Sequence, residues 1–156
     1  MLTEWTLATA MAVFMAFFHL ICLAILVRVL RFRERLFRTL RIMPLTLLVA
    51  VTVGLVVIHA LEIWLYAFLY IRVHALADLE QALYFSIVTY STVGYGDIVL
   101  PRQWRILGAT EAPVGVIMLG WSTAFLISLL SQIRLLGADW LAPLDEVFEE
   151  TTGSRR

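Results

Sequence analysis

The sequence has little charge and no lysine. Only 15% of its 156 residues are charged while 62% are hydrophobic, and all twelve basic residues are arginine. A soluble domain of this size could not bury so much apolar surface, so the composition favours a lipid bilayer as the solvent. The formal net charge is zero, but the charges are strongly segregated along the chain.

The sequence also has only one cysteine, Cys22. A single cysteine cannot form an intrachain disulfide, and the multi-cysteine patterns of metal sites are absent. The three histidines are scattered, and neither a nucleophile–base pair nor a metal-ligand spacing is present. We therefore expect neither an enzyme nor a protein that needs a cofactor, and we expect no nucleic-acid partner.

Three long apolar runs dominate what is there. Residues 5–27 carry no charge over 23 positions, enough for a helix to cross a hydrocarbon core of about 30 Å. A cleavable signal peptide is the alternative for this run, but a basic start and a small-residue cleavage site are both missing, so we predict a retained span. The second span is expected from about Leu45, after Pro44, to Ile71, and the third from about Ile106 to Ile133.

An arginine-rich segment follows the first span. It holds six arginines within fourteen residues, with apolar residues at three- and four-residue steps, which predicts a separate amphipathic helix lying on a membrane face. A voltage sensor is the rejected alternative, because its arginines would have to lie within a span. The six are Arg28, Arg31, Arg33, Arg35, Arg38 and Arg41. Residues 1–44 are thus predicted to form an N-terminal unit of span and interfacial helix.

Four ionisable side chains lie inside the predicted spans: His19, His59, Glu62 and Glu111. Such groups are costly in a bilayer and usually face protein or water. We expect His19 to be packed or hydrogen-bonded rather than a ligand, and Glu62 to bond a neighbouring helix. For Glu111 we expect a partner in Glu62 or in the short helix that precedes residue 91.

That short helix is predicted over Leu79–Tyr90. Asp78 is a suitable N-cap residue, and Gln81 three residues later completes a capping-box pattern. Twelve residues are too few to cross a bilayer, so this helix must be re-entrant or interfacial. Backbone that leaves the helix at membrane depth must then be buried in protein or line a cavity.

The residues that follow are Thr92-Val93-Gly94-Tyr95-Gly96-Asp97. Successive backbone carbonyls, with the Thr92 hydroxyl at one end, can replace the hydration shell of a cation. Neighbouring carbonyls point the same way only if the backbone alternates in hand, and Gly94 and Gly96 can adopt positive φ without steric cost. Asp97 at the mouth would raise the local concentration of cations.

This run resembles the selectivity filter of potassium channels. The resemblance covers about residues 45–134 and implies their pore domain: an outer helix, a pore helix, a filter and an inner helix. The implied fold is an all-α membrane protein with three transmembrane helices, a re-entrant pore helix and a filter loop. Because one chain supplies one loop, the resemblance implies a homotetramer around a central pore, with K⁺ bound by Thr92, Val93, Gly94, Tyr95 and Gly96.

The helix before the filter departs from the family pattern. Many members carry a tryptophan pair where this chain has Tyr84 and Phe85, and some bacterial members carry a buried glutamate where it has Val88. Phenylalanine cannot donate the hydrogen bond that usually steadies the filter tyrosine or the acid after it. We therefore expect weaker support for the filter, with inactivation or reduced selectivity as the result.

The third span is expected to line the ion path. The resemblance implies a cavity and gate lined by one helix face, made of Val116, Leu119, Thr123 and Ile127. Pro113 and Gly115 predict a bend over residues 109–116, with Gly120 as an alternative hinge. Close helix packing is an equally good explanation for both glycines.

The arginine distribution predicts the orientation. With three spans and a re-entrant loop, the arginine-rich segment and the C-terminal tail share one side and hold nine of the twelve arginines. The positive-inside rule places that side in the cytoplasm and the N-terminus outside, in the bacterial inner (plasma) membrane. The acidic tail, residues 135–156, is expected to dock on the arginine-rich helix, to remain solvated, or to form a small four-helix bundle.

The predicted function is a potassium-selective channel. A weakly selective cation channel and a non-conducting accessory subunit of a larger channel are the alternatives. Tyr95 argues against the first alternative, because non-selective members of the family tend to lose that residue.

Overall fold

The computed structural model describes residues 2–37 and 43–135. These residues form helices and contain no strand, so the predicted all-α fold class is confirmed. The elements are α1 (Leu2–Phe37), α2 (Met43–Arg72), α3 (Leu79–Tyr90), the short 3-10 helix η1 (Arg102–Trp104) and α4 (Arg105–Leu135).

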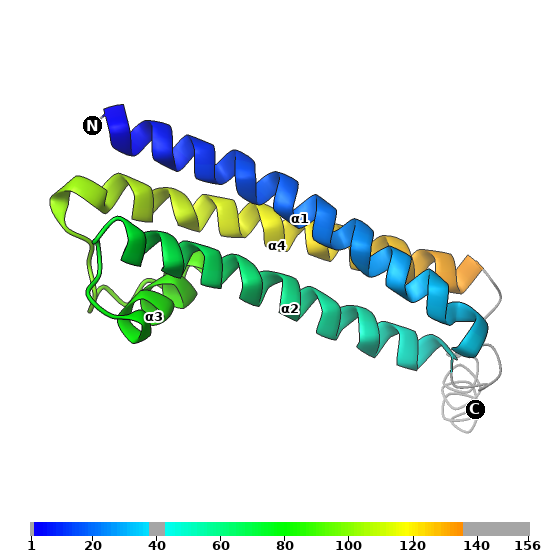
Figure 1. Ribbon diagram of the computed structural model, residues 1–156. Coiled ribbons are helices and arrows are strands. Elements are labelled where there is room, and N and C mark those ends of the chain that lie inside the picture. The colour runs from blue at the N-terminus through cyan, green and yellow to red at the C-terminus, as the bar shows by residue number, and fades with distance from the viewer. Residues whose placement is uncertain (1, 38–42, 136–156) are drawn as a thin grey trace, which may run out of the picture.

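The three long helices lie side by side, and α3 packs against one end of them (Figure 1). Helices α1 and α4 run in one direction and α2 runs in the other. The N-terminus lies at the end that carries α3, whereas the C-terminal end of α1 lies at the opposite end. Thus the arginines of α1 and the loop after α3 are separated by the length of the bundle.

Each long helix contains a stretch that is long and apolar enough to cross a membrane: Leu2–Leu30, Thr46–Arg72 and Arg102–Ser131. Large apolar side chains on these stretches, such as Phe17 and Val56, are exposed. Such a surface is stable in contact with lipid rather than with water. The chain is therefore a multi-pass membrane protein, with the three spans at the positions expected from the sequence.

The predicted separation of the arginine-rich helix from the first span is corrected. We expected a break near Arg28 and a second helix beyond it, but α1 continues without interruption to Phe37. The reason is that residues 2–43 contain neither glycine nor proline, so no residue favours a helix end at Arg28. Helix α2 then begins at Met43, with Pro44 in its first turn, where a proline removes no helical hydrogen bond.

Two sets of predictions fall outside the described residues. The linker at residues 38–42 includes Arg38 and Arg41, and the acidic tail beyond Leu135 includes the segment for which three alternative arrangements were expected.

A mainly aromatic core joins α3 to the long helices. It includes the buried side chains of Tyr66, Tyr70, Phe85, Tyr90 and Leu107. Tyr70 and Phe85 meet edge to face, with ring centroids 5.2 Å apart and planes at 84°, an arrangement favoured by the ring quadrupoles. Helix α1 adds Ala8 and Met15 to the same cluster.

Candidate functional site

Helix α3 begins and ends at the predicted residues. The Asp78 carboxylate accepts a hydrogen bond of 2.8 Å from the backbone N–H of Gln81, and Asp78 has the extended backbone of an N-cap residue. At the other end, the Ser91 N–H still bonds the Ile87 carbonyl. The capped twelve-residue helix expected from the sequence is therefore confirmed.

The loop after α3 folds back along that helix. The Thr92 N–H bonds the carbonyl of Thr89, and the Gly94 N–H bonds the carbonyl of Val88, both at 2.9 Å. Further along, the Tyr84 hydroxyl donates to the Asp97 carboxylate at 2.7 Å. These contacts lie at successively earlier positions of α3, so the six-residue motif returns toward the end at which the helix began.

The backbone of this loop alternates in hand. The φ angles of Thr92, Gly94 and Gly96 are +63°, +53° and +77°, whereas Val93 and Tyr95 between them do not have positive φ. The positive φ expected at both glycines is therefore confirmed. Thr92 adopts the left-handed conformation without being glycine, which costs about 1–2 kcal/mol; such strain is characteristic of functional sites.

The apolar side chains of the loop are exposed in the single chain. Val93 is 52% exposed and Tyr95 is 71% exposed. The part of the loop from Ser91 to Asp97 is exposed throughout. The chain thus presents a full segment of loop surface that its own helices do not cover.

The expected lack of hydrogen-bonded support is corrected for Asp97. Phe85 donates no hydrogen bond, as predicted, but the neighbouring Tyr84 does so in its place. This hydrogen bond lowers the pKa of the Asp97 carboxyl below its ordinary value and raises the pKa of the Tyr84 hydroxyl. Phe85 itself packs in the core against Tyr70. Tyr84 therefore provides the hydrogen bond, and Phe85 provides the core contact.

The C-terminal end of α3 is held by a polar cluster, which we call the Glu62 cluster: the buried residues His19, Glu62 and Tyr90 and the half-buried His59. The Glu62 carboxylate lies 2.9 Å from His19 Nδ1 and 3.0 Å from His59 Nδ1. The Tyr90 hydroxyl donates to the same carboxylate at 2.6 Å. The expected hydrogen bonds of His19 and Glu62 to neighbouring helices are therefore confirmed.

A second buried glutamate holds the middle of α3. Glu111 of α4 contacts the hydroxyls of Tyr70 and Ser86, each at 2.5 Å. Ser86 also lies 3.0 Å from the carbonyl of Ile63. Because Ser86 has a single hydroxyl proton, both of its contacts are satisfied only if the Glu111 carboxyl supplies a proton. Of the two expected partners of Glu111, the short helix is confirmed.

Gly115 allows α4 to approach the end of α3. A Cβ at this position would overlap the Tyr90 carbonyl oxygen. Close packing therefore accounts for Gly115. At Gly120 a Cβ would meet nothing within 4 Å. Helix α4 is continuous through Pro113, and hinge motion at these residues stays a prediction.

The four residues expected to line the ion path share an exposed face of α4. Val116, Leu119, Thr123 and Ile127 are all exposed in the single chain. The Thr123 hydroxyl donates to the Leu119 carbonyl one turn earlier, so it is satisfied without a partner outside the helix. Their role in a cavity or gate stays a prediction.

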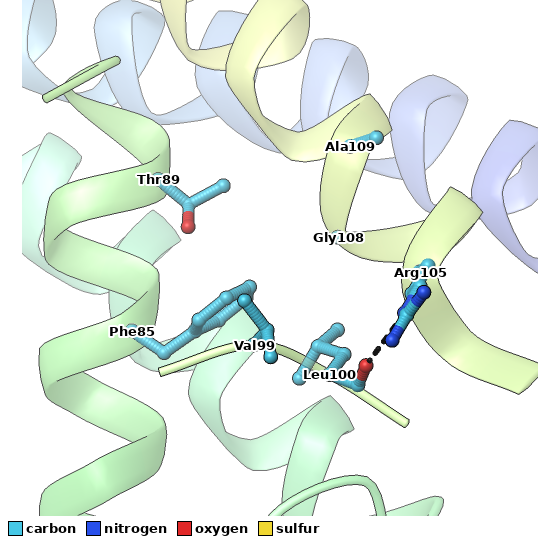
Figure 2. Close-up of a pocket in the computed structure, with 7 residues that line it drawn as sticks. All are labelled: Phe85, Thr89, Val99, Leu100, Arg105, Gly108 and Ala109. Atoms are coloured by element: carbon cyan, nitrogen blue, oxygen red, sulfur yellow. Dashed lines mark hydrogen bonds between the residues drawn. The ribbon is translucent and has the colours of Figure 1, made fainter. Parts of the chain in front are cut away.

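A cavity of about 500 Å³ lies between α3, the returning loop and the start of α4 (Figure 2). Phe85 and Thr89 point toward it from α3, and the Arg105 side chain bonds the Leu100 carbonyl at 3.3 Å on the opposite side. The other lining residues are Val99, Gly108 and Ala109. The loop is therefore incompletely packed on this side.

Sequence reasoning missed the Glu62 cluster as a unit. It treated the histidines as scattered, yet His19 and His59 lie with ring centroids 5.5 Å apart. The available signal was the pair His59 and Glu62, which are three residues apart on one helix and both ionisable inside a span. The convergence of His19 onto that pair depends on how α1 packs, which no local pattern encodes.

Three membrane-spanning helices, a short capped helix and a returning loop of alternating hand are the parts that the sequence resemblance implies for a channel pore. Comparison with protein families agrees: the model of a family described as ion channel matches residues 45–132, more than half of the chain. The chain therefore belongs to this ion channel family, of the two-transmembrane type that contains potassium channel pores. No curated protein and no solved structure gives a significant match.

Proposed function

We propose that the protein is a potassium-selective channel in which four copies each contribute one filter loop, Thr92–Gly96. Potassium ions would be held by the backbone carbonyls of the loop and, at its inner end, by the Thr92 hydroxyl. Membership of an ion channel family supplies the class of function. The ion is inferred from the loop itself.

The alternation of backbone hand is the observation that carries this proposal. The φ angle is positive at Thr92, Gly94 and Gly96 and is not positive at the residues between them. This pattern turns successive carbonyls toward one side. A file of such carbonyls replaces the hydration shell of K⁺. Two hydrogen bonds from α3 support the shape of the filter. The Val88 carbonyl accepts from the Gly94 N–H, and the Tyr84 hydroxyl donates to Asp97.

The exposed loop supports assembly into a homotetramer. One chain supplies only a quarter of the coordination ring, and the side chains of Val93 and Tyr95 have little cover within it. Cyclic symmetry places these surfaces, and the exposed face of Val116, Leu119 and Ile127, around a common axis. The same symmetry would make that face of α4 the wall of the ion path.

The proposed orientation places the filter mouth outside the plasma membrane. Arginines Arg28, Arg31, Arg33 and Arg35 belong to α1, whose C-terminal end lies opposite α3 (Figure 1). The positive-inside rule assigns that end to the cytoplasm. Asp97, at the other end, would then attract cations from outside.

Purified protein in liposomes tests the proposal. We expect potassium flux at least tenfold above sodium flux, with block by barium. We expect loss of that ratio in Gly94→Ala, because alanine is strained at a φ of +53°. Val53→Ala, on a lipid-exposed part of α2, is the control and should keep the ratio.

Two results would contradict the proposal. Equal potassium and sodium fluxes would indicate a weakly selective cation channel. Absence of flux from folded, tetrameric protein would indicate an accessory subunit.

A further inference from the structure

We propose that His19, His59 and Glu62 form a binding site for a divalent metal ion of the zinc class. The site would join α1 to α2 directly behind the end of α3. It does not depend on the proposed ion selectivity, because it uses no atom of the filter loop.

The donor atoms of the three residues already converge. One ligand atom from each residue can be chosen so that all lie within 4.8 Å of one another. His19 Nδ1 and His59 Nδ1 approach different oxygens of the same carboxylate, at 2.9 and 3.0 Å. Ligands about 2.1 Å from a tetrahedral zinc ion are about 3.4 Å apart, so these two pairs need only small movements to bind one ion.

The donor set suits zinc. Two imidazole nitrogens and one carboxylate oxygen form a ligand group that binds Zn²⁺ with a fourth position left for water or another group. The Tyr90 hydroxyl lies beside that position, 2.9 Å from His59 Nδ1 and 2.6 Å from Glu62 Oε2. It can serve as the fourth ligand or hydrogen-bond a bound water.

The surroundings orient the imidazoles for this use. His19 Nε2 lies 3.4 Å from the Ser122 hydroxyl of α4, the kind of outer contact that fixes a histidine ligand through its second nitrogen. His59 Nε2 is buried and has no hydrogen-bond partner in residues 2–37 and 43–135. All polar contacts of the His59 ring are therefore made through Nδ1, which faces Glu62 and Tyr90.

The charge of Glu62 also favours a cation. Glu62 and His19 are fully buried within spans, where an uncompensated carboxylate is expensive. Within the described part of the chain, the ion pairs of Glu62 are made with histidines alone. A divalent ion would compensate the negative charge of the carboxylate even if both histidines are neutral. Two neutral histidines without a metal ion cannot compensate that charge.

Metal binding by the full-length protein in detergent tests this site. After treatment with a chelator and dialysis, the protein is titrated with zinc chloride against a chromophoric competitor. We expect one Zn²⁺ per chain, and at least a tenfold loss of affinity in His59→Ala. His74→Ala is the matched control, since His74 is the remaining histidine and lies exposed in the linker between α2 and α3; it should bind as the unaltered protein does.

Cobalt provides a measurement that needs no variant. Co²⁺ in the unaltered protein should give the intense visible absorption of a four-coordinate site, and added Zn²⁺ should abolish it. Failure to bind stoichiometric Zn²⁺, equal affinity in His59→Ala, or only the weak absorption of six-coordinate Co²⁺ would each overturn the proposal. These results concern binding at equilibrium, so they remain distinct from any failure of potassium flux.

Discussion

Glu62 and Glu111 are both fully buried and both hold α3, but they do so with different partners. Glu62 bonds two imidazoles and the Tyr90 hydroxyl. Glu111 bonds hydroxyls among the described residues, those of Tyr70 and Ser86. The first site has neighbours that can carry positive charge, whereas the partners of the second are neutral.

This difference indicates how the two glutamates are tolerated inside the bilayer. A charged carboxylate at membrane depth requires a cation or many donors. Glu62 is surrounded by polar partners, which are the imidazoles of His19 and His59 and the Tyr90 hydroxyl, and the proposed metal ion would supply a cation. At Glu111 the single proton of Ser86 and its two acceptors indicate a carboxyl that keeps its own proton. A carboxylate with two imidazole partners therefore anchors the end of α3 nearest the filter, and a carboxyl with hydroxyl partners anchors its middle.

The largest expected effect is that of Glu62→Ala. Removing this carboxylate leaves three buried donors of the Glu62 cluster without their common acceptor, and breaking such a buried pair costs about 3–5 kcal/mol. Thermal denaturation in detergent should show a large fall in the midpoint. Glu80→Ala, at an exposed position of α3, is the control and should change the midpoint little. Equal shifts for the two variants would show that the cluster does not hold the helix.

Gly115→Ala should come next. The added methyl overlaps the Tyr90 carbonyl, and overpacking of this kind costs about 1–3 kcal/mol. Gly120→Ala is the matched control, because its methyl meets nothing within 4 Å and alanine favours the helix. The comparison uses the same denaturation midpoint. A Gly115→Ala protein as stable as Gly120→Ala would exclude close packing as the reason for glycine.

Glu111→Gln should have a smaller effect than Glu62→Gln. The amide retains one acceptor and one donor, as a protonated carboxyl does, so we expect a loss of about 1 kcal/mol or less. At Glu62 the amide has one acceptor oxygen where the carboxylate has two, so it cannot accept from both imidazoles and the Tyr90 hydroxyl, and the loss should be larger. The two variants are compared by denaturation at neutral pH. Equal losses would remove the contrast between a charged and a neutral site.

The smallest effect is expected at the exposed anchor, Tyr84. Its hydrogen bond lowers the pKa of Asp97 from the ordinary value of 3.8. The stabilisation is therefore complete above that value and is lost as the pH falls through the lowered pKa. In Tyr84→Phe the pKa should rise toward 3.8, which a carbon-13 NMR titration of the Asp97 carboxyl measures. An unchanged pKa would show that the hydroxyl does not support the acid.

The sequence predicted the elements better than their contacts. The lengths of the apolar runs predicted the three spans, and the pair Asp78 and Gln81 predicted the first residue of α3. Both predictions succeeded because caps and spans are local properties of the sequence. The continuity of α1 past Arg28 was not predicted, because the change in charge pattern suggested a boundary there. The absence of glycine and proline, which would end a helix, indicates continuity instead. Tyr84 was expected in the support of the filter mouth together with Asp97, Phe85 and Val88, but its hydrogen bond to Asp97 was not predicted, because the family pattern has tryptophan rather than tyrosine as the donor in this helix.

The partners of the buried polar residues could be predicted only in part. A glutamate inside a span must find a partner, which made bonding of Glu62 and Glu111 predictable. Which residues they bond depends on the packing of four helices. His19 and Glu62 are separated by 43 positions in the sequence, and their contact follows from the way α1 lies against α2.

The reversal potential of the reconstituted channel, with potassium on one side of the bilayer and sodium on the other, tests the central proposal most directly. Each tenfold preference for one ion moves the reversal potential by about 60 mV. A potassium-selective filter predicts a shift of at least that size toward the potassium equilibrium potential, and its loss in Gly94→Ala. A reversal potential near zero in the unaltered protein would contradict the assignment of a potassium filter to Thr92–Gly96.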